Sequence, residues 1–378
     1  MDGPHHILLV PGFFGFANLG DFAYFGHVRD LLADVGPGLG FDGDVHVALT
    51  EPTSTLQRRA ALLAETVDEL LKARGGQLSI IGHSSGGLDA RLFISPGVQL
   101  PTTVDVERCA ARVRAVVTVA SPHHGTPLAE HFTSLFGQKL LALLSLATVY
   151  TLRTGRLPIS FVLRLARLLR RPGAQPAGVV DQLFLQLLGD FSGKRRRAIE
   201  AFFRTVGSDH GLGAQLSPTK MVAFNAATAD RAGVRYGSVV TRARAPGIRT
   251  LVRAGLGPYA QATHALFVVL YRFAAGRPGD PPKILLPAQA EMLRNAYGRL
   301  PDHRANDGIV PSLSQVWGEV LCAVWADHHD VIGHFHRPTH VPRHFDWVAS
   351  GTGFDRPHFD ALWRTVAEAL AGGNKAQP

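Results

Sequence analysis

Residues 78–93 read LSIIGHSSGGLDARLF, and this stretch decides the fold. A short apolar run ends in the pentapeptide GHSSG, centred on Ser84, and a segment compatible with a helix follows at once. A serine between two glycines at a strand-to-helix turn is the layout of a nucleophile elbow, in which a strained turn lifts the hydroxyl clear of the sheet. Gly82 and Gly86 remove bulk where neighbouring backbone must pass closely. The alternative is an ordinary glycine-rich turn, so the interpretation depends on an acid, a base and an oxyanion hole elsewhere.

Apolar runs and amphipathic segments alternate around this stretch. Compact apolar runs at residues 6–10, 44–49 and 113–119 predict strands buried on both faces of a parallel sheet, and residues 22–35 and 55–74 carry apolar side chains at helical spacing. Strands separated by helices predict an α/β fold with a mostly parallel, doubly wound sheet. Further elements of the same kind follow, with strands at 234–240 and 319–325 and helices at 288–297 and 359–371.

The alternation breaks down in two places, which we interpret as insertions. Residues 128–220 hold apolar and basic helical patterns without a convincing strand, and residues 246–300 hold a second, mainly helical segment. Both insertions are expected to build a helical cap, or lid. The predicted core then consists of the remaining segments, 1–127, 221–245 and 301–378.

Composition limits the kinds of partner. The 378 residues carry a formal net charge of +9, which favours anionic membranes, nucleic acid or acidic substrates. The basic residues are not interleaved with aromatic residues on a known nucleic-acid module, so no nucleic-acid partner is predicted. Residues 159–169, ISFVLRLARLL, place arginines among aliphatic side chains at helical spacing, as in a helix that lies on a lipid interface. A helix packed on the main domain with solvated arginines fits the pattern equally well.

No segment of the sequence predicts a transmembrane helix. The uncharged apolar run of the first insertion has thirteen residues, between 139 and 153, which is shorter than the roughly 20 residues of a membrane-spanning helix. The N-terminus leads straight into the first strand, so we expect a cytoplasmic protein if the chain is complete and a secreted one if a leader has been removed. Cys109 and Cys322 lie in or beside apolar runs, which favours two buried thiols and leaves a disulfide open.

An acid and a base follow the serine in the order that such a site requires. Asp307 lies in an Asn-Asp-Gly turn at 306–308, before an apolar pair, and a plain turn of this type is the alternative. Beyond the last predicted strand, residues 326–334 read ADHHDVIGH and hold three histidines that compete for the role of base. A histidine suits that role because its pKa near neutrality lets it take the serine proton and return it to the leaving group.

A glycine-bracketed loop, PGFFGF at 11–16, follows the first predicted strand. Backbone N–H groups in such a loop point at a substrate carbonyl when the loop forms part of an oxyanion hole, and we select the N–H of Phe13 as the donor. The alternative is an ordinary apolar turn whose phenylalanines pack in the core.

In this order, PGFFGF, GHSSGG, NDGIVP and DHHDVIGH resemble the motifs of the bacterial triacylglycerol lipases and esterases of the α/β-hydrolase fold. The similarity extends to SPHHGT at 121–126, to Phe224-Asn225 and to GVRY at 233–236, and it skips both insertions. Two positions depart from the family pattern: Pro11-Gly12 stands where the family has His-Gly, and His329 replaces an apolar residue. The resemblance implies a nucleophile at Ser84, an acid at Asp307, a base at His328, backbone oxyanion donors at Phe13 and Ser85, and a ligand of a structural calcium at Asp330.

These features together predict hydrolysis of acyl esters through a covalent acyl-enzyme, without an obligatory cofactor. The apolar cap suggests an aliphatic acyl chain, and its arginines suggest a lipid interface or an anionic head group. The same triad would also serve an acyltransferase, a thioesterase or a polyester depolymerase. A catalytically silent protein that binds membrane surfaces through its basic cap is the alternative from another functional class.

Overall fold

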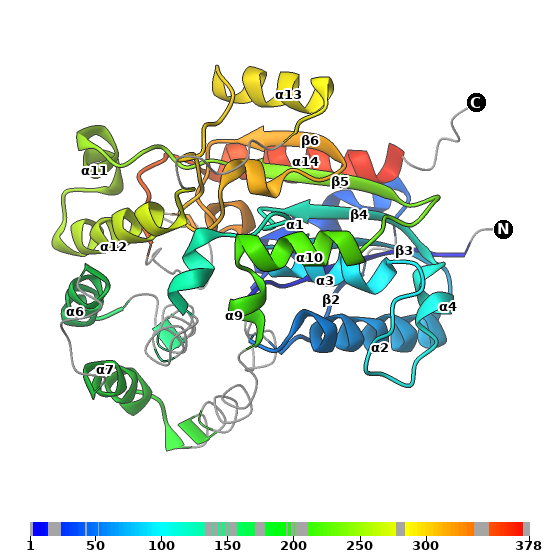
Figure 1. The fold of residues 1–378 in the computed structure, drawn as a ribbon, viewed down its shortest axis with the longest axis horizontal. Coiled ribbons are helices and arrows are strands. Elements are labelled where there is room, and N and C mark those ends of the chain that lie inside the picture. Colours follow the sequence, from blue (N-terminus) through cyan, green and yellow to red (C-terminus); the bar gives the residue numbers. More distant parts are fainter. Residues whose placement is uncertain are drawn as a thin grey trace.

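A six-stranded parallel sheet forms the centre of the protein (Figure 1). The structure is a computed structural model, and it describes residues 3–13, 24–41, 44–51, 53–132, 157–170, 178–193, 211–276, 284–335 and 348–372, with isolated positions between 139 and 200. Every neighbouring pair of strands is parallel, which confirms the predicted α/β fold with its doubly wound sheet. The sheet order is β2-β1-β3-β4-β5-β6, formed by β1 (His5–Val10), β2 (Val45–Val47), β3 (Gln77–His83), β4 (Val113–Val119), β5 (Arg235–Thr241) and β6 (Glu319–Val324).

Helices cover both faces of the sheet. The helices α2 (Leu56–Arg74), α3 (Ser85–Ile94) and α4 (Val106–Ala110) pack on one another along one face, and α1 (Gly26–Val35) packs with α14 (Arg356–Gly372) along the other. The central strands β1 and β3 are buried almost throughout, whereas the edge strands β2 and β6 are mostly half-buried. Isoleucine, leucine and valine dominate the central strands because both of their faces are covered.

Local signals set the ends of these elements. Helix α2 begins after Thr55, whose side chain accepts a hydrogen bond from the N–H of Arg58, and it ends at Gly75, which has a φ of 66°. Strand β2 is shorter than the predicted 44–49 because it is an edge strand that pairs only with β1. The predicted start of the first helix, at residue 22, lies outside the described residues.

Between β4 and β5 the described residues contain helices and no strand. The helices are α6 (Ile159–Arg170), α7 (Gly178–Gly189), α9 (Gly211–Gln215) and α10 (Pro218–Ala227), and between β5 and β6 they are α11 (Ile248–Ala254), α12 (Pro258–Ala274) and α13 (Pro287–Tyr297). Helix α6 packs against α12, burying Phe161, Val162 and Leu165 while exposing Arg164. The division into core and cap stays a prediction. Among the described helices, none is long and apolar enough to cross a bilayer.

The two cysteine thiols are both free. Cys109 is buried on α4, and Cys322 is half-buried on the edge strand β6. Burial raises the pKa of the Cys109 thiol to about 11 and that of Cys322 to about 12, so both remain protonated thiols at neutral pH. The chain thus holds two separate thiols rather than the disulfide that the sequence left open.

Candidate active site

Ser84 lies at a strained turn between β3 and α3. Its φ is 56° and its ψ is −132°, a backbone conformation that residues other than glycine rarely adopt. The turn is held by hydrogen bonds from Ser84 N to Val119 O at 2.8 Å and from Gly87 N to Ser84 O at 3.1 Å. Ser84 therefore stands at the carboxyl end of its strand with its backbone fixed, which is the geometry of a nucleophile elbow.

Glycines surround Ser84 because the backbone packs too tightly there for a side chain. A Cβ on Gly12 would lie 2.5 Å from Ser84 Cβ, and one on Gly86 would collide with the carbonyl oxygen of Val10. A Cβ on Gly82 would collide with the backbone of α3. The need for residues without bulk thus arises from direct contact between β1, the loop after it and the elbow.

Both predicted oxyanion donors are sequence neighbours of residues at the elbow. Phe13 is buried and follows Gly12, which packs against Ser84. Ser85 is the first residue of α3, so its N–H has no acceptor within the helix. Residues 14–16 of the predicted oxyanion loop lie outside the described residues.

A buried ion pair ties this loop to two helices. Arg59, on α2, is fully buried and donates to the carboxylate of Asp89, on α3, at 2.6 to 3.1 Å. The same guanidinium donates to Pro11 O at 2.8 Å and to Glu51 O at 3.0 Å. Burial raises the pKa of Asp89 to about 6, and the charge of Arg59 opposes that rise. Arg59 therefore fixes the loop after β1 relative to the elbow helix.

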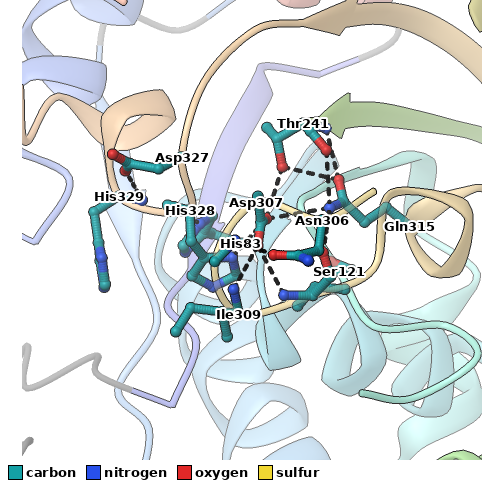
Figure 2. Close-up of polar contacts among 12 residues, drawn as sticks. His83, Ser121, Thr241, Asn306, Asp307, Ile309, Gln315, Asp327, His328 and His329 are labelled. Carbon is teal, nitrogen blue, oxygen red and sulfur yellow. Dashed lines mark hydrogen bonds and ion pairs between the residues drawn. The ribbon is translucent and has the colours of Figure 1, made fainter. Parts of the chain in front are cut away.

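Asp307 and His328 form a buried hydrogen-bonded pair (Figure 2). The distance from His328 Nδ1 to Asp307 Oδ2 is 2.9 Å. His328 Nε2 is also buried and has no hydrogen-bond partner within the described part of the chain. The His328 ring packs on the ring of His83, the residue before Ser84, with centroids 4.7 Å apart. The unbonded nitrogen is the one that a reacting serine requires.

Both carboxylate oxygens of Asp307 accept further hydrogen bonds (Figure 2). Oδ1 accepts from the N–H groups of Ile309 at 2.9 Å and Val310 at 2.7 Å. Oδ2 accepts from the hydroxyl of Thr241 at 2.7 Å and from Nε2 of Gln315 at 3.1 Å, in addition to His328. A carboxylate bonded on every side is held in one orientation before any substrate arrives.

His328 is the histidine of its loop that bonds Asp307. The ring of His329 lies edge-on to that of His328, with centroids 5.6 Å apart. Burial lowers the pKa of His329 to about 3, so its ring is neutral at pH 7. The third histidine, His334, contacts His329, with centroids 6.5 Å apart.

Two hydrogen bonds hold His83 against His328. The hydroxyl of Tyr24 donates to His83 Nδ1 at 2.7 Å, and His83 Nε2 donates to His328 O at 2.9 Å. This pattern requires a neutral ring with its proton on Nε2. Burial, together with the neighbouring His328, lowers the pKa of His83 well below its usual value. The residue before Ser84 thus anchors the backbone of His328.

Asp330, the predicted calcium ligand, is bonded within its own turn. Its Oδ2 accepts from Asp327 N at 3.1 Å, and Asp327 Oδ1 accepts from the N–H groups of His329 and Asp330, both at 3.0 Å. Burial raises the pKa of Asp327. The described residues contain no cluster of three or more His, Cys, Asp or Glu side chains that could hold a metal. These carboxylates cap their own turn, and a calcium site at Asp330 stays a prediction.

Several polar residues of this region are not marked by any motif. Thr241 and Gln315 hold Asp307, but they lie in different segments and carry no local pattern. For one further residue, Arg59, the sequence does contain a signal, which is a charged side chain on the apolar face of a helix. Arg59 shares the face of Leu56 and Leu63 on α2, a position where a solvated side chain is not expected.

Comparison with known proteins relates the chain to lipases. No profile of a known protein family matches the chain. Over 131 residues it is 28% identical to a triacylglycerol lipase of Pseudomonas fragi. The match covers 34% of this chain, and the chain spans 39% of the length of that relative.

Solved structures share the whole fold. The lipase 1 of Pelosinus fermentans gives a TM-score of 0.51 at 16% identity, covering 97% of this chain and 99% of that one. A metagenomic carboxyl esterase gives 0.50 at 17% identity, with 98% and 76% covered. The Staphylococcus hyicus lipase gives 0.50 at 14% identity, with 99% and 97% covered. The α/β-hydrolase fold is confirmed, as is the resemblance to bacterial lipases and esterases that the sequence indicated.

Proposed function

We propose that this protein is a serine hydrolase of carboxylic esters, of the lipase or esterase kind. The proposal rests on the buried Asp307–His328 pair. The Nε2 of His328 has no partner among the described residues, and its ring packs against His83, the residue before Ser84. The similarity to a triacylglycerol lipase of Pseudomonas fragi supports ester chemistry, although the chain spans 39% of that relative. The shared fold adds support because it carries a serine elbow at the carboxyl end of its sheet.

In the proposed mechanism, Ser84 attacks the ester carbonyl while His328 Nε2 accepts the hydroxyl proton. Asp307 holds the imidazole through Nδ1 and stabilises the imidazolium that forms. The N–H groups of Phe13 and Ser85 donate to the oxyanion of the tetrahedral intermediate. His328 then gives its proton to the leaving alcohol, which leaves an acyl-enzyme. Water, deprotonated by the same histidine, releases the carboxylic acid and restores Ser84.

The substrate of this reaction is an ester with an aliphatic acyl chain. The helices α6 and α12 lie towards the end of the sheet at which the strands finish (Figure 1). Helix α6 exposes Leu163 together with Arg164 and Arg167, and helix α7 exposes Leu185. Exposed leucines with arginines nearby support contact with a lipid interface. A calcium ion at Asp330 would have a structural role only, and a lower melting temperature in the presence of a chelator would report it.

Ser84→Ala tests the proposed reaction directly. We expect hydrolysis of p-nitrophenyl esters to fall by about 10⁴-fold or more, because the attacking oxygen is removed. Covalent labelling by a fluorophosphonate should disappear in the same variant. Thr103→Ala, at an exposed position before α4, is the control and should retain both properties. Undiminished hydrolysis in Ser84→Ala would rule out this nucleophile.

A further inference from the structure

A pocket lies beyond the carboxyl ends of β5 and β6, and no residue of the elbow lines it. Its volume is about 600 Å³, within the range of about 300–1,000 Å³ typical of small-molecule sites. We call it the arginine pocket, and its walls include Arg244, Arg253, Val324, Trp325 and Phe354. None of these side chains belongs to the elbow or to the Asp307–His328 pair.

Two guanidinium groups gather at one indole ring of this pocket. The guanidinium carbon of Arg244 lies 4.6 Å from the centroid of Trp325, and that of Arg242 lies 4.9 Å from it. Arg244 is held in place because its Nε donates to Thr352 O at 3.4 Å. Arg253, on α11, is the second arginine of the pocket wall, whereas Arg242 contacts Trp325 without lining the pocket. The indole therefore stands in a region of concentrated positive charge.

No carboxylate in the described residues neutralises these three arginines. Arg242 is only 8% exposed, and its Nη1 has no hydrogen-bond partner within the same residues. The pocket's remaining titratable side chain, His358, is paired with Asp355. An anion that enters this pocket therefore meets Arg244 and Arg253 on its wall, and the unpaired charge of Arg242 adds to the positive potential there.

Much of the remaining wall is apolar. Phe354 is buried, and Val324 and Ala323 from the end of β6 continue the surface beside Trp325. A ligand that matches this surface has an apolar part of some length as well as an anionic head. A bare inorganic anion would leave the apolar wall uncovered.

We propose that the arginine pocket binds an anionic amphiphile. Its carboxylate or phosphate head lies on Arg244 and Arg253, and its alkyl chain runs along Trp325 and Phe354. Guanidinium groups suit such heads because they present paired N–H donors to planar or tetrahedral oxyanions. A free fatty acid and an alkyl phosphate share this chemistry. The pocket is separate from Ser84, so the proposal does not depend on the proposed ester hydrolysis.

Isothermal titration calorimetry on the full chain tests the ligand class. The probes are dodecanoate and dodecyl phosphate below their micelle concentrations, and dodecanol below its solubility limit. We expect both anions to bind and the neutral alcohol to bind at least about tenfold more weakly, because it lacks the charge that the arginines bind. The tighter of the two anions identifies the head group. Equal affinity for dodecanol would overturn the proposal.

Arginine variants test the location of the site. Arg253→Met and Arg244→Met should each weaken both anions by about tenfold or more, since each loses charge-assisted hydrogen bonds. Arg249→Met is the matched control, because Arg249 is an exposed arginine of the same helix and does not line the pocket. Circular dichroism melts check folding, and Arg253 is itself exposed, so its substitution remains decisive. Equal affinities in Arg253→Met and Arg249→Met would contradict the assignment.

Discussion

The Asp307–His328 pair and the arginine pocket lie at the same edge of the sheet, but their charges are bonded differently. The carboxylate of Asp307 accepts hydrogen bonds at both oxygens, at 2.7 to 3.1 Å. Arg242, behind the pocket, keeps an Nη1 without a partner in the described residues. Since buried polar groups are normally bonded, the carboxylate of Asp307 is completed by the protein itself, whereas the guanidinium of Arg242 is not.

This difference separates two uses of a buried charge. A carboxylate that orients an imidazole needs a fixed environment, because a misplacement of about 1 Å costs about 10²-fold in rate. A recognition pocket gains from the opposite arrangement, because unmatched charge contributes to affinity when the anion arrives. Both regions use segments that follow parallel strands, the edge at which α/β proteins place their ligands.

Substitution of Asp307 is expected to have the largest effect, and it tests whether the fully bonded carboxylate is needed for catalysis. Asp307→Asn keeps the shape of the side chain but presents an amide to His328 Nδ1, which favours the wrong tautomer. We expect kcat for p-nitrophenyl esters to fall by about 10⁴-fold, with little change in KM. A steady-state loss smaller than about tenfold would show that the bonding around Asp307 is not needed for catalysis.

The sheet is predictable from the sequence because burial on both faces restricts its residues. Strand β4, Val113–Val119, has the predicted bounds, and β1 starts one residue earlier than the predicted 6–10. The edge strand β2 is shorter than its apolar run, because pairing on one side alone determines how far it continues. Periodicity reports burial, whereas the extent of an edge strand depends on its partner.

The site is predictable only where local geometry restricts the residue type. The GHSSG motif is recognisable in the sequence because the elbow excludes side chains at Gly82 and Gly86. The residues that hold Asp307 are different, since Thr241 and Gln315 lie 74 positions apart and meet only through the fold. Three histidines in one loop cannot be ranked by spacing, and the hydrogen bond of His328 to Asp307 distinguishes them.

The two buried arginines, Arg59 and Arg242, are expected to differ in how much they contribute to the stability of the fold. Arg59→Met leaves Asp89 buried and unpaired, so we expect the free energy of unfolding to fall by about 3–5 kcal/mol. Arg242→Met removes a cation without a counter-charge and loses its contacts with Tyr297 and Trp325, so a change below about 1 kcal/mol is expected. Urea-induced unfolding measures both. Equal losses would show that Arg242 is already satisfied within the protein.

Gln315→Leu is expected to have the smallest effect and tests whether this side chain positions Asp307. Gln315 Nε2 donates to Asp307 Oδ2 at 3.1 Å, and a hydrogen bond to a charged group contributes about 1.5–3 kcal/mol, so kcat should fall roughly 10- to 100-fold. A positioning role predicts that the loss appears in kcat with little change in KM. Ser314→Ala, in the same turn but without a bond to Asp307, should leave both constants unchanged. An unchanged kcat in Gln315→Leu would reduce Gln315 to a purely structural residue.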